Sequence, residues 1–93
     1  MKILAVCGFG VGSSMVLKMT IEKASKELGL DASVENTDLS TAKATSADVY
    51  FTSNELLPEL KTSVKAPVYA IKKYMDKNEV KQQLENYLAE KEG

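Results

Sequence analysis

The chain has 93 residues, with twelve basic and thirteen acidic side chains and a formal net charge of -1. A chain of this length supports one domain that buries about 60 to 65 % of its unfolded surface, so we expect residues 1–93 to form one domain. Charges of both signs are mixed along the chain, with only two Phe and no Trp, which argues against a nucleic-acid partner or a polybasic membrane surface. Histidine is absent, so the chain cannot supply Ser-His-Asp or Cys-His catalysis by itself, and we expect neither a metal site nor a cofactor.

The amino-terminal segment lacks the features of a targeting or membrane-spanning sequence. Lys2 is followed by only a handful of apolar residues before Gly8. A signal-peptide core or a membrane span requires a much longer apolar run, so we expect a cytoplasmic protein. The single cysteine, Cys7, cannot form an internal disulfide, and its thiol stays free in a reducing compartment.

Apolar patterning predicts strands that alternate with helices. Short apolar or β-branched runs indicate buried strands, and weaker alternation indicates an edge strand. The predicted strands are residues 2–7, 31–37, 48–53 and 66–71, of which 31–37 is the edge strand. The predicted helical segments are a helix over 14–28, a short helix or irregular crossover over 39–47, a short helix over 54–60, and a long helix after Asp76.

Local signals predict where the first and third helical segments end or begin. Gly29, followed by the apolar Leu30, predicts the end of the first helix. Asn54 is the expected N-cap of the short helix that runs through Leu60, with Pro58 near its first turn.

The start of the last helix carries two further signals. Asp76 and Glu79 have the spacing of a capping box. Met75 and Val80 have the spacing of a hydrophobic staple, in which the residue before the N-cap packs against the first apolar residue of the helix.

Strands that alternate with helices predict an α/β fold with a parallel sheet and right-handed crossovers. For four strands we expect the order 2-1-3-4, a Rossmann-like or flavodoxin-like sheet flanked by helices. This order places a switch point between the strand that ends at Cys7 and the strand that ends at Ser53. Ligands bind at the carboxyl ends of strands beside such a point, so the segment after Cys7 lies where a site is expected.

The segment CGFGVGSSM, residues 7–15, combines three glycines with two hydroxyls at the start of a predicted helix. Glycines allow the backbone to turn tightly and aim N–H groups inward, and a helix that begins near Ser13 adds unpaired donors and a positive dipole end. These features predict an anion cradle; the alternative is that the glycines only permit the turn. The segment lacks the Gly-Lys-Ser/Thr of a Walker loop and the Gly-x-Gly-x-x-Gly spacing of a dinucleotide site.

Cys7 stands at the entry of this cradle. Converging N–H groups and a helix terminus stabilise a thiolate over a thiol, whereas the alternative role is a small apolar residue that ends a buried strand. A nucleophilic sulfur in such a cradle can accept a phosphoryl group and form phosphocysteine. Cys-x5-Arg phosphatases place an arginine after their loop to hold the phosphate in the transition state. The corresponding residue here is Ser13, which favours transfer of the phosphoryl group over hydrolysis.

The segment ILAVCGFGVGSSMVLKM, residues 3–19, resembles the active-site segment of the cytoplasmic IIB components of the bacterial phosphoenolpyruvate-dependent phosphotransferase system (PTS). It is most similar to the ascorbate branch, which typically reads Cys-Gly-x-Gly-x-Gly-Ser-Ser followed by Met and a Lys-Met pair. The length and the α/β alternation of the whole chain are compatible with this family. The resemblance therefore implies that residues 1–93 are one IIB-type domain.

The resemblance implies a phosphotransferase that acts as the phosphoryl carrier of a sugar transport system, of the L-ascorbate type. Cys7 would take phosphate from a phosphohistidine of a IIA partner and deliver it to a sugar or ascorbate bound by a membrane IIC partner. The absence of histidine fits this role, because the donor imidazole belongs to another protein. The phosphate cradle that the resemblance implies consists of Gly8, Phe9, Gly10, Val11, Gly12, Ser13 and Ser14. Phe9 and Val11 occupy variable positions of the segment and leave the substrate open.

Two other functions stay open at this point. One is a low-molecular-weight cysteine-dependent phosphatase, which the missing arginine disfavours, and the other is a non-catalytic anion-binding regulatory module. Thr52, Ser53 and Asn54 end the neighbouring strand and either line the site or serve as turn and cap. Met15 and Met19 lie one helical turn apart and are either core or rim residues or a docking surface for the IIA and IIC partners.

Overall fold

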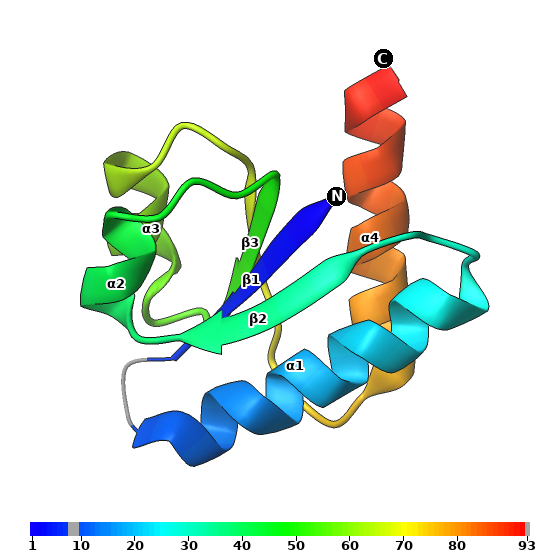
Figure 1. The fold of residues 1–93 in the computed structure, drawn as a ribbon, viewed down its shortest axis with the longest axis horizontal. Helices are drawn as coiled ribbons and strands as arrows, with labels where there is room; N and C mark the ends of the chain where they lie inside the picture. Colours follow the sequence, from blue (N-terminus) through cyan, green and yellow to red (C-terminus); the bar gives the residue numbers. More distant parts are fainter. Residues whose placement is uncertain (8–9, 93) are drawn as a thin grey trace.

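The computed structural model contains a parallel sheet whose strands alternate with helices along the chain (Figure 1). It describes residues 1–7 and 10–92, and the side chains of these residues except those of 10–13 and 92. The strands are β1 (Lys2–Val6), β2 (Ser33–Thr37), β3 (Val49–Thr52) and β4 (Val68–Ala70). The helices are α1 (Gly10–Glu27), α2 (Leu39–Lys43), α3 (Leu57–Ser63) and α4 (Lys77–Glu92). Within this described part of the chain, no helix combines the length and apolar composition that crossing a bilayer requires.

The strand order is β2-β1-β3-β4 and every pairing in it is parallel, which confirms the predicted fold class and order. β1 pairs with β2 from Lys2 opposite Ser33 to Val6 opposite Thr37. The two central strands, β1 and β3, are buried on both faces over nearly their whole length. Their continuous apolar runs follow from this position, because helices cover both sides of a parallel sheet.

Helices cover both faces of the sheet, α1 and α4 on one side and α2 and α3 on the other (Figure 1). The larger core, between the sheet and α1 with α4, includes Ile3, Leu17, Ile21, Phe51, Val80 and Leu84. The smaller core, between the sheet and α2 with α3, includes Leu4, Val6, Ala42, Tyr50 and Leu60. Burying one side chain of Val, Leu, Ile or Phe size contributes about 1.5 to 3 kcal/mol, so these two cores hold the strands in register.

The first helix ends where the glycine signal predicts. Gly29 follows α1 with a φ of 72°, a left-handed conformation that glycine adopts without steric cost. The Gly29 N–H donates to the Lys26 carbonyl at 3.1 Å, and the Leu30 N–H donates to the Ser25 carbonyl at 2.9 Å. These bonds satisfy carbonyls at the end of the helix, so the predicted stop is confirmed.

Asp76 caps α4, but only half of the predicted capping box forms. Asp76 Oδ1 accepts hydrogen bonds from the Asn78 N–H at 3.0 Å and from the Glu79 N–H at 3.2 Å. The Glu79 carboxylate accepts instead from the backbone N–H groups of Lys72 and Lys73, at 2.7 and 3.0 Å. Glu79 therefore fixes the turn that follows β4 rather than the cap itself.

Two other predictions about helix starts are wrong: the hydrophobic staple before α4 and the Asn54 cap of the short helix. Met75 is 81 % exposed whereas Val80 is fully buried, so the predicted staple between them does not form. The short helix over 54–60 is shifted along the chain: α3 begins at Leu57 and Asn54 lies before it. Pro58 determines this start, because a residue without an N–H is tolerated in the first turn of a helix.

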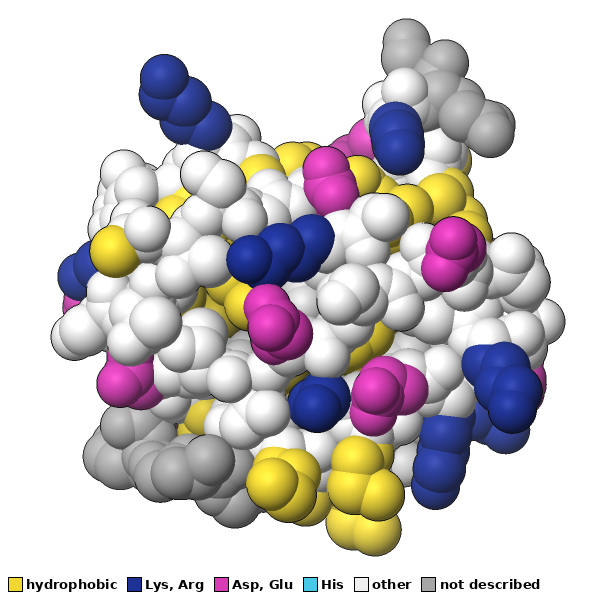
Figure 2. Space-filling view, in the orientation of Figure 1, with side chains coloured by type: hydrophobic (Ala, Val, Ile, Leu, Met, Phe, Trp, Pro, Cys, Tyr) yellow, Lys and Arg dark blue, Asp and Glu magenta, His cyan; other side chains and the backbone are white. Residues whose placement is uncertain are grey.

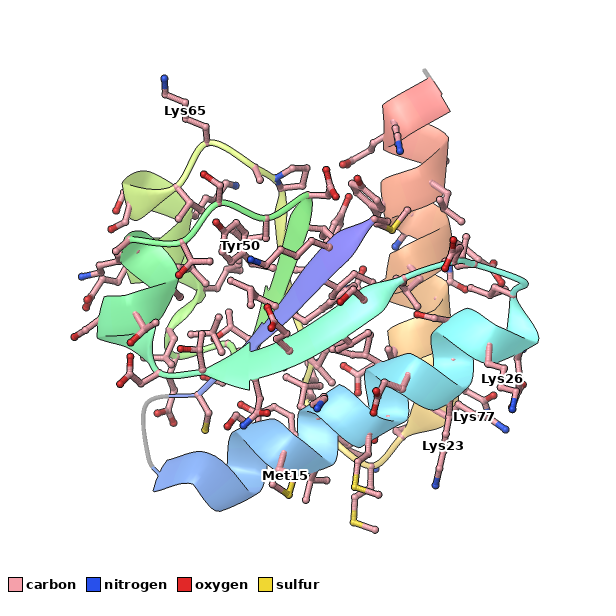
Figure 3. All side chains as sticks on the ribbon, in the orientation of Figure 1. Met15, Lys23, Lys26, Tyr50, Lys65 and Lys77 are labelled. Carbon is pink, nitrogen blue, oxygen red and sulfur yellow. The ribbon has the colours of Figure 1, made fainter. Side chains whose placement is uncertain are left out.

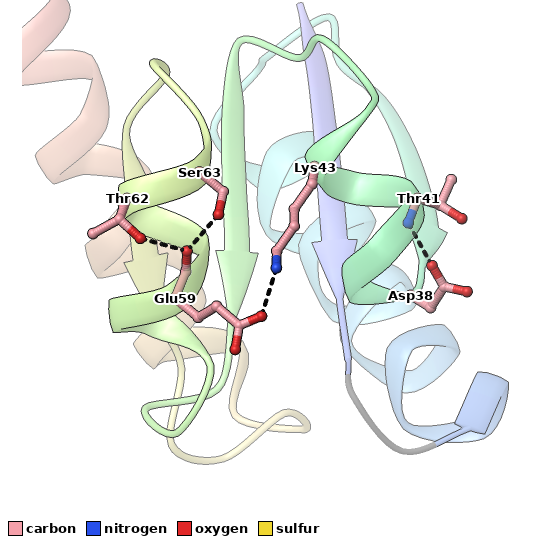
Figure 4. A network of polar contacts seen from close by, with 6 residues as sticks. All are labelled: Asp38, Thr41, Lys43, Glu59, Thr62 and Ser63. Carbon is pink, nitrogen blue, oxygen red and sulfur yellow. Dashed lines mark hydrogen bonds and ion pairs between the residues drawn. The ribbon is translucent and has the colours of Figure 1, made fainter.

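The crossover between β2 and β3 contains the short helix α2, one of the two alternatives that the sequence allowed. Asp38 Oδ1 accepts a hydrogen bond from the Thr41 N–H at 2.7 Å, and this bond lowers the pKa of the Asp38 carboxyl (Figure 4). Lys43 pairs with Glu59 of α3 at 2.6 Å. Both side chains of that pair are substantially exposed, so we expect little net stabilisation from it. Apolar packing against the sheet therefore holds these two short helices.

Candidate active site

Cys7 lies at the carboxyl end of β1, between β2 and β3. Its backbone N–H donates to the Thr37 carbonyl at 3.3 Å, so the pairing with β2 continues to this residue. On the other side Ala5 lies opposite Phe51, and the same register brings Cys7 level with Ser53. Cys7 carries a free thiol and is only 7 % exposed. The predicted switch point between the ends of β1 and β3 is therefore present, and Cys7 follows directly after β1 there.

The helix that follows Cys7 begins earlier than predicted. The apolar spacing predicted a helix over 14–28, whereas α1 starts at Gly10. Glycine has low helix propensity, so a pattern search places the start too late here. The N–H groups of the first turn lack intrahelical acceptors, and the helix dipole leaves positive charge at this end, so an anion is favoured there. Gly8 and Phe9, and the side chains of 10–13, lie outside the described residues.

Ser14, in the second turn of α1, is tied to the edge strand. Ser14 is 2 % exposed, and its hydroxyl accepts a hydrogen bond from Asn36 Nδ2 at 3.2 Å. Asn36 lies opposite Ala5 in the pairing of β2 with β1, two residues before Cys7 along β1. The sequence analysis did not single out Asn36. Its only signal is its place near the end of a strand that the order 2-1-3-4 puts beside β1.

The polar residues that end β3 have distinct positions. Thr52 is fully buried, and its hydroxyl donates to the Val6 carbonyl at 2.9 Å, so it joins β3 to β1. Ser53 and Asn54 line a pocket of about 250 Å³ at the carboxyl end of the sheet. Ser53 Oγ also accepts a hydrogen bond from the Leu56 N–H at 3.3 Å. Ser53 therefore takes part in the turn before α3 and also lines this pocket.

Tyr74 is a further residue at this pocket that the sequence analysis missed. It lies in the turn between β4 and α4 and lines this pocket together with Ser53. Burial raises the pKa of Tyr74 above its usual value of 10.0, and the neighbouring Cys7 and Glu55 raise it further. The hydroxyl therefore remains protonated near neutral pH and can act as a hydrogen-bond donor.

An exposed apolar surface lies beside the start of α1. We call it the methionine surface; it consists of Met15, Val16, Met19 and Met75, which are 50, 36, 51 and 81 % exposed. Figure 2 shows hydrophobic side chains standing out at the lower edge of the molecule, over α1, and Figure 3 places Met15 there. A groove of about 370 Å³ runs between this part of α1 and the turn before α4, with Lys23 and Lys77 among its lining residues. The exposure of Met15 and Met19 excludes a core position for either residue.

Two further hollows lie away from Cys7. They have volumes of about 380 and 530 Å³ and lie near the amino ends of β3 and β4, where Figure 3 labels Tyr50 and Lys65. Within the described residues, no group of three His, Cys, Asp or Glu side chains is placed to hold a metal ion.

Comparison with known proteins identifies the family. The family described as "PTS system, Lactose/Cellobiose specific IIB subunit" matches residues 2–86. The chain is 40 % identical over 88 residues to the "Ascorbate-specific PTS system EIIB component" of Mycoplasma pneumoniae, a match that covers 92 % of this chain and 93 % of that protein. Its fold is similar to that of the lactose-specific IIB component domain from Streptococcus pneumoniae, with a TM-score of 0.73 and 13 % identity over 94 % of this chain and 96 % of that one. The chain therefore belongs to the lactose/cellobiose-specific IIB subunit family of the phosphotransferase system.

Proposed function

We propose that residues 1–93 act as one phosphoryl carrier of a sugar phosphotransferase system, and that Cys7 is the residue that carries the phosphate. A IIA partner donates the phosphoryl group from a phosphohistidine, and a membrane IIC partner presents the sugar that receives it. The observation that carries the proposal is the position of Cys7, which ends a central strand at the switch point, three residues before the first residue of α1. Membership of the IIB family supports the class of reaction.

Each of the two transfers exchanges one bond to phosphorus for another. In the first, Cys7 Sγ attacks the phosphorus atom, the S–P bond forms, and the P–N bond to the donor imidazole breaks. The proton that the thiol gives up balances the proton that the leaving imidazole takes up. In the second, a hydroxyl oxygen of the sugar attacks the phosphorus atom, so that the O–P bond forms and the S–P bond breaks. The proton that the sugar hydroxyl loses balances the proton that the restored thiol takes up. No phosphate passes to water in either step.

The phosphoryl group of phosphocysteine is expected to lie against the first turn of α1. The backbone N–H groups of this turn lack intrahelical acceptors and stand at the positive end of an 18-residue helix. The proposed cradle consists of Gly8, Phe9, Gly10, Val11, Gly12, Ser13 and Ser14. The hydrogen bond from Asn36 to Ser14 fixes the far end of this cradle against β2.

Transfer is better supported than hydrolysis. The sequence contains no arginine, whereas Cys-x5-Arg phosphatases depend on a guanidinium group to clamp the phosphate in the transition state. A phosphatase would turn over p-nitrophenyl phosphate and lose that activity in Cys7→Ser. A non-catalytic anion-binding module would retain its function in Cys7→Ser. The carrier proposal predicts neither result.

We infer that L-ascorbate is the acceptor that the IIC partner presents. The support is the relative with 40 % identity, whose printed name is ascorbate-specific and whose match covers 92 % of this chain. The family description itself names lactose and cellobiose. Transfer assays with ascorbate, lactose and cellobiose as competing acceptors separate these possibilities.

The methionine surface supports transfer between proteins. Met15, Val16 and Met19 lie in the second and third turns of α1, the helix that begins three residues after Cys7. Lys23 and Lys77 line the adjoining groove, and Lys77 also pairs with Glu27. We infer a protein partner with an apolar centre and an acidic rim, since these complement methionine side chains bordered by lysines. Methionine also adapts its shape readily, which suits a surface that binds more than one partner in turn.

A reconstituted relay tests the proposal. Labelled phosphoenolpyruvate, the general phosphotransferase proteins, the cognate IIA protein and membrane vesicles that contain the IIC partner are combined with the native chain or with Cys7→Ser. We expect label on the acceptor only with the native chain. Transfer at the native rate in the presence of Cys7→Ser would overturn the proposal.

A further inference from the structure

The exposed methionines of the protein gather on one surface. Met15, Met19 and Met75 are 50, 51 and 81 % exposed, whereas the fourth methionine, Met1, packs against the larger core. Met15 and Met19 lie one turn apart on α1. Met75 comes from the turn before α4 and lines the same groove as Met19. Thioethers from two distant parts of the chain therefore lie on the methionine surface, and Figure 3 shows sulfur atoms standing out beside α1 there.

Hydrogen bonds on both sides of Met75 hold it in this position. The Glu79 carboxylate accepts from the backbone N–H groups of Lys72 and Lys73, at 2.7 and 3.0 Å. Asp76 Oδ1 accepts a hydrogen bond from the Glu79 N–H at 3.2 Å. These bonds fix the turn while the Met75 side chain stays outside the core, so its sulfur is open to reagents in the solvent.

Exposed thioethers react with hydrogen peroxide, and the reaction changes their polarity. The sulfur attacks one peroxide oxygen, so that an S–O bond forms, the O–O bond breaks and water leaves. Sulfur loses the two electrons that the peroxide gains. The product, methionine sulfoxide, is a polar side chain in place of an apolar one. Methionine sulfoxide reductases reverse the change: two thiols become a disulfide, and the sulfoxide oxygen leaves as water.

We propose that the methionine surface is a site of reversible oxidation, at which hydrogen peroxide converts Met15, Met19 and Met75 to sulfoxides and thereby slows phosphotransfer between this chain and its protein partners. The inference rests on the proposed function, since it requires a partner that covers this surface. The apolar centre of such a partner offers no hydrogen-bond donor to a sulfoxide oxygen. An oxygen buried without a donor weakens binding, so oxidation acts on docking and not on the chemistry at Cys7.

Oxidation of this surface should leave the fold intact. The described residues of the two cores include Met1 but not Met15, Met19 or Met75. A sulfoxide oxygen on any of these three side chains stays in water in the free protein, and changes at such surface positions have little effect on stability. We therefore expect the same midpoint of urea denaturation before and after oxidation, which distinguishes weaker docking from unfolding.

The experiment oxidises the native chain with hydrogen peroxide while Cys7 is protected. Peroxide also oxidises thiolates, so Cys7 is first blocked as a mixed disulfide and is released afterwards with dithiothreitol. Mass spectrometry measures the sulfoxide at each methionine, which should form faster at Met15, Met19 and Met75 than at Met1. Phosphotransfer from the IIA protein is then measured at concentrations below saturation.

We expect the rate of this transfer to fall about tenfold, the effect of one buried oxygen without a hydrogen-bond partner. Methionine sulfoxide reductases should restore the native rate.

The matched control is the triple variant Met15→Leu, Met19→Leu and Met75→Leu. Leucine has a volume similar to that of methionine and keeps the surface apolar, but it contains no sulfur. The triple variant should therefore transfer phosphate at the native rate both before and after treatment with peroxide. It retains Met1 and Cys7, so it also reports any effect of peroxide on those two residues.

The outcomes separate the inference from the proposed function. A rate that falls in the oxidised native chain, recovers with the reductases and stays unchanged in the triple variant supports the oxidation site. A native rate in the oxidised chain, an equal fall in the triple variant, or sulfoxides that form no faster on this surface than at Met1 overturns it, while transfer through Cys7 still stands. An unoxidised native chain that is not phosphorylated at all defeats the proposed function, and this inference with it.

Discussion

The side-chain amide of Asn36 donates a hydrogen bond to the hydroxyl of Ser14 at 3.2 Å, and it thereby joins the edge strand β2 to the second turn of α1. Both are at least partly buried, so the bond is shielded from competition with water. It fixes the orientation of the helix end that is proposed to hold phosphate.

Asn36→Ala should lower the free energy of unfolding by about 1 kcal/mol, the usual net contribution of one hydrogen bond. It should also weaken the binding of inorganic phosphate, because the start of α1 is held less firmly. Urea denaturation and phosphate titration followed by NMR measure the two effects. Asn86→Ala is the matched control, since Asn86 bonds to Gln83 on the exposed face of α4, and we expect it to change stability by less than about 0.5 kcal/mol. Equal phosphate affinity in native and Asn36→Ala protein would contradict the role of Asn36.

Gly29→Ala should destabilise the protein by about 1 kcal/mol through its backbone conformation alone. Gly29 has a φ of 72°, and nothing lies within 4 Å of the position that an added Cβ would occupy. Gly29→Asn should cost less, since asparagine tolerates the left-handed region better than alanine. Urea denaturation of the three proteins checks this order. An alanine variant as stable as the native chain would show that the end of α1 does not depend on glycine.

Met19→Glu should slow phosphotransfer between proteins without changing the reactivity of the thiol. Met19 is 51 % exposed at the centre of the methionine surface, and a carboxylate there opposes an acidic-rimmed partner. Time-course assays with the IIA protein and with IIC-containing vesicles measure the rate of phosphotransfer. The rate of alkylation of Cys7 measures the reactivity of the thiol. Ala89→Glu adds the same charge at an exposed position of α4 and should leave both unchanged. Native transfer rates to and from Met19→Glu would exclude the methionine surface as a contact of either partner.

Stability should fall at alkaline pH because of three tyrosines. Burial, with neighbouring ionisable groups, raises the pKa of Tyr69, Tyr74 and Tyr87 above 10.0 in the folded protein. The unfolded chain releases these protons near pH 10, so their contribution is complete below that pH and is lost as the pH rises through the higher folded values. Urea denaturation at about pH 8 and about pH 10.5 measures the loss. Tyr69→Phe removes one of these groups and should lose less stability between these two pH values. A loss identical to that of the native chain would contradict the raised pKa of Tyr69.

Most of the fold could be predicted because its signals are local or periodic. Burial is indicated directly by the apolar runs of β1 and β3 and by the helical spacing of Leu17 and Ile21. Gly29 indicates a left-handed backbone conformation in the same direct way. The errors arose where two local signals competed. The staple spacing placed Met75 in contact with the start of α4, but the carboxylate of Glu79 binds the preceding turn and Met75 is left exposed.

The site could be predicted only in part, for a similar reason. Cys7 and the proposed cradle lie in one continuous segment, so their residue types and spacing could suggest them from the sequence alone. Asn36 and Tyr74 reach the site from β2 and from the turn after β4. Their roles depend on the order of strands and on the path of a turn, which periodicity does not encode. Contacts that join distant parts of the chain are therefore the part of the site that sequence patterns miss.

Locating the phosphoryl group by mass spectrometry tests the central claim most directly. The native chain is incubated with phosphoenolpyruvate, the general phosphotransferase proteins and the cognate IIA protein, and is then digested and analysed under conditions that preserve the S–P bond. The account predicts one phosphoryl group on the peptide that contains Cys7, bound to its sulfur, and no label on Cys7→Ser. A native chain without label, or equal labelling of Cys7→Ser, would contradict the claim that Cys7 carries the phosphate.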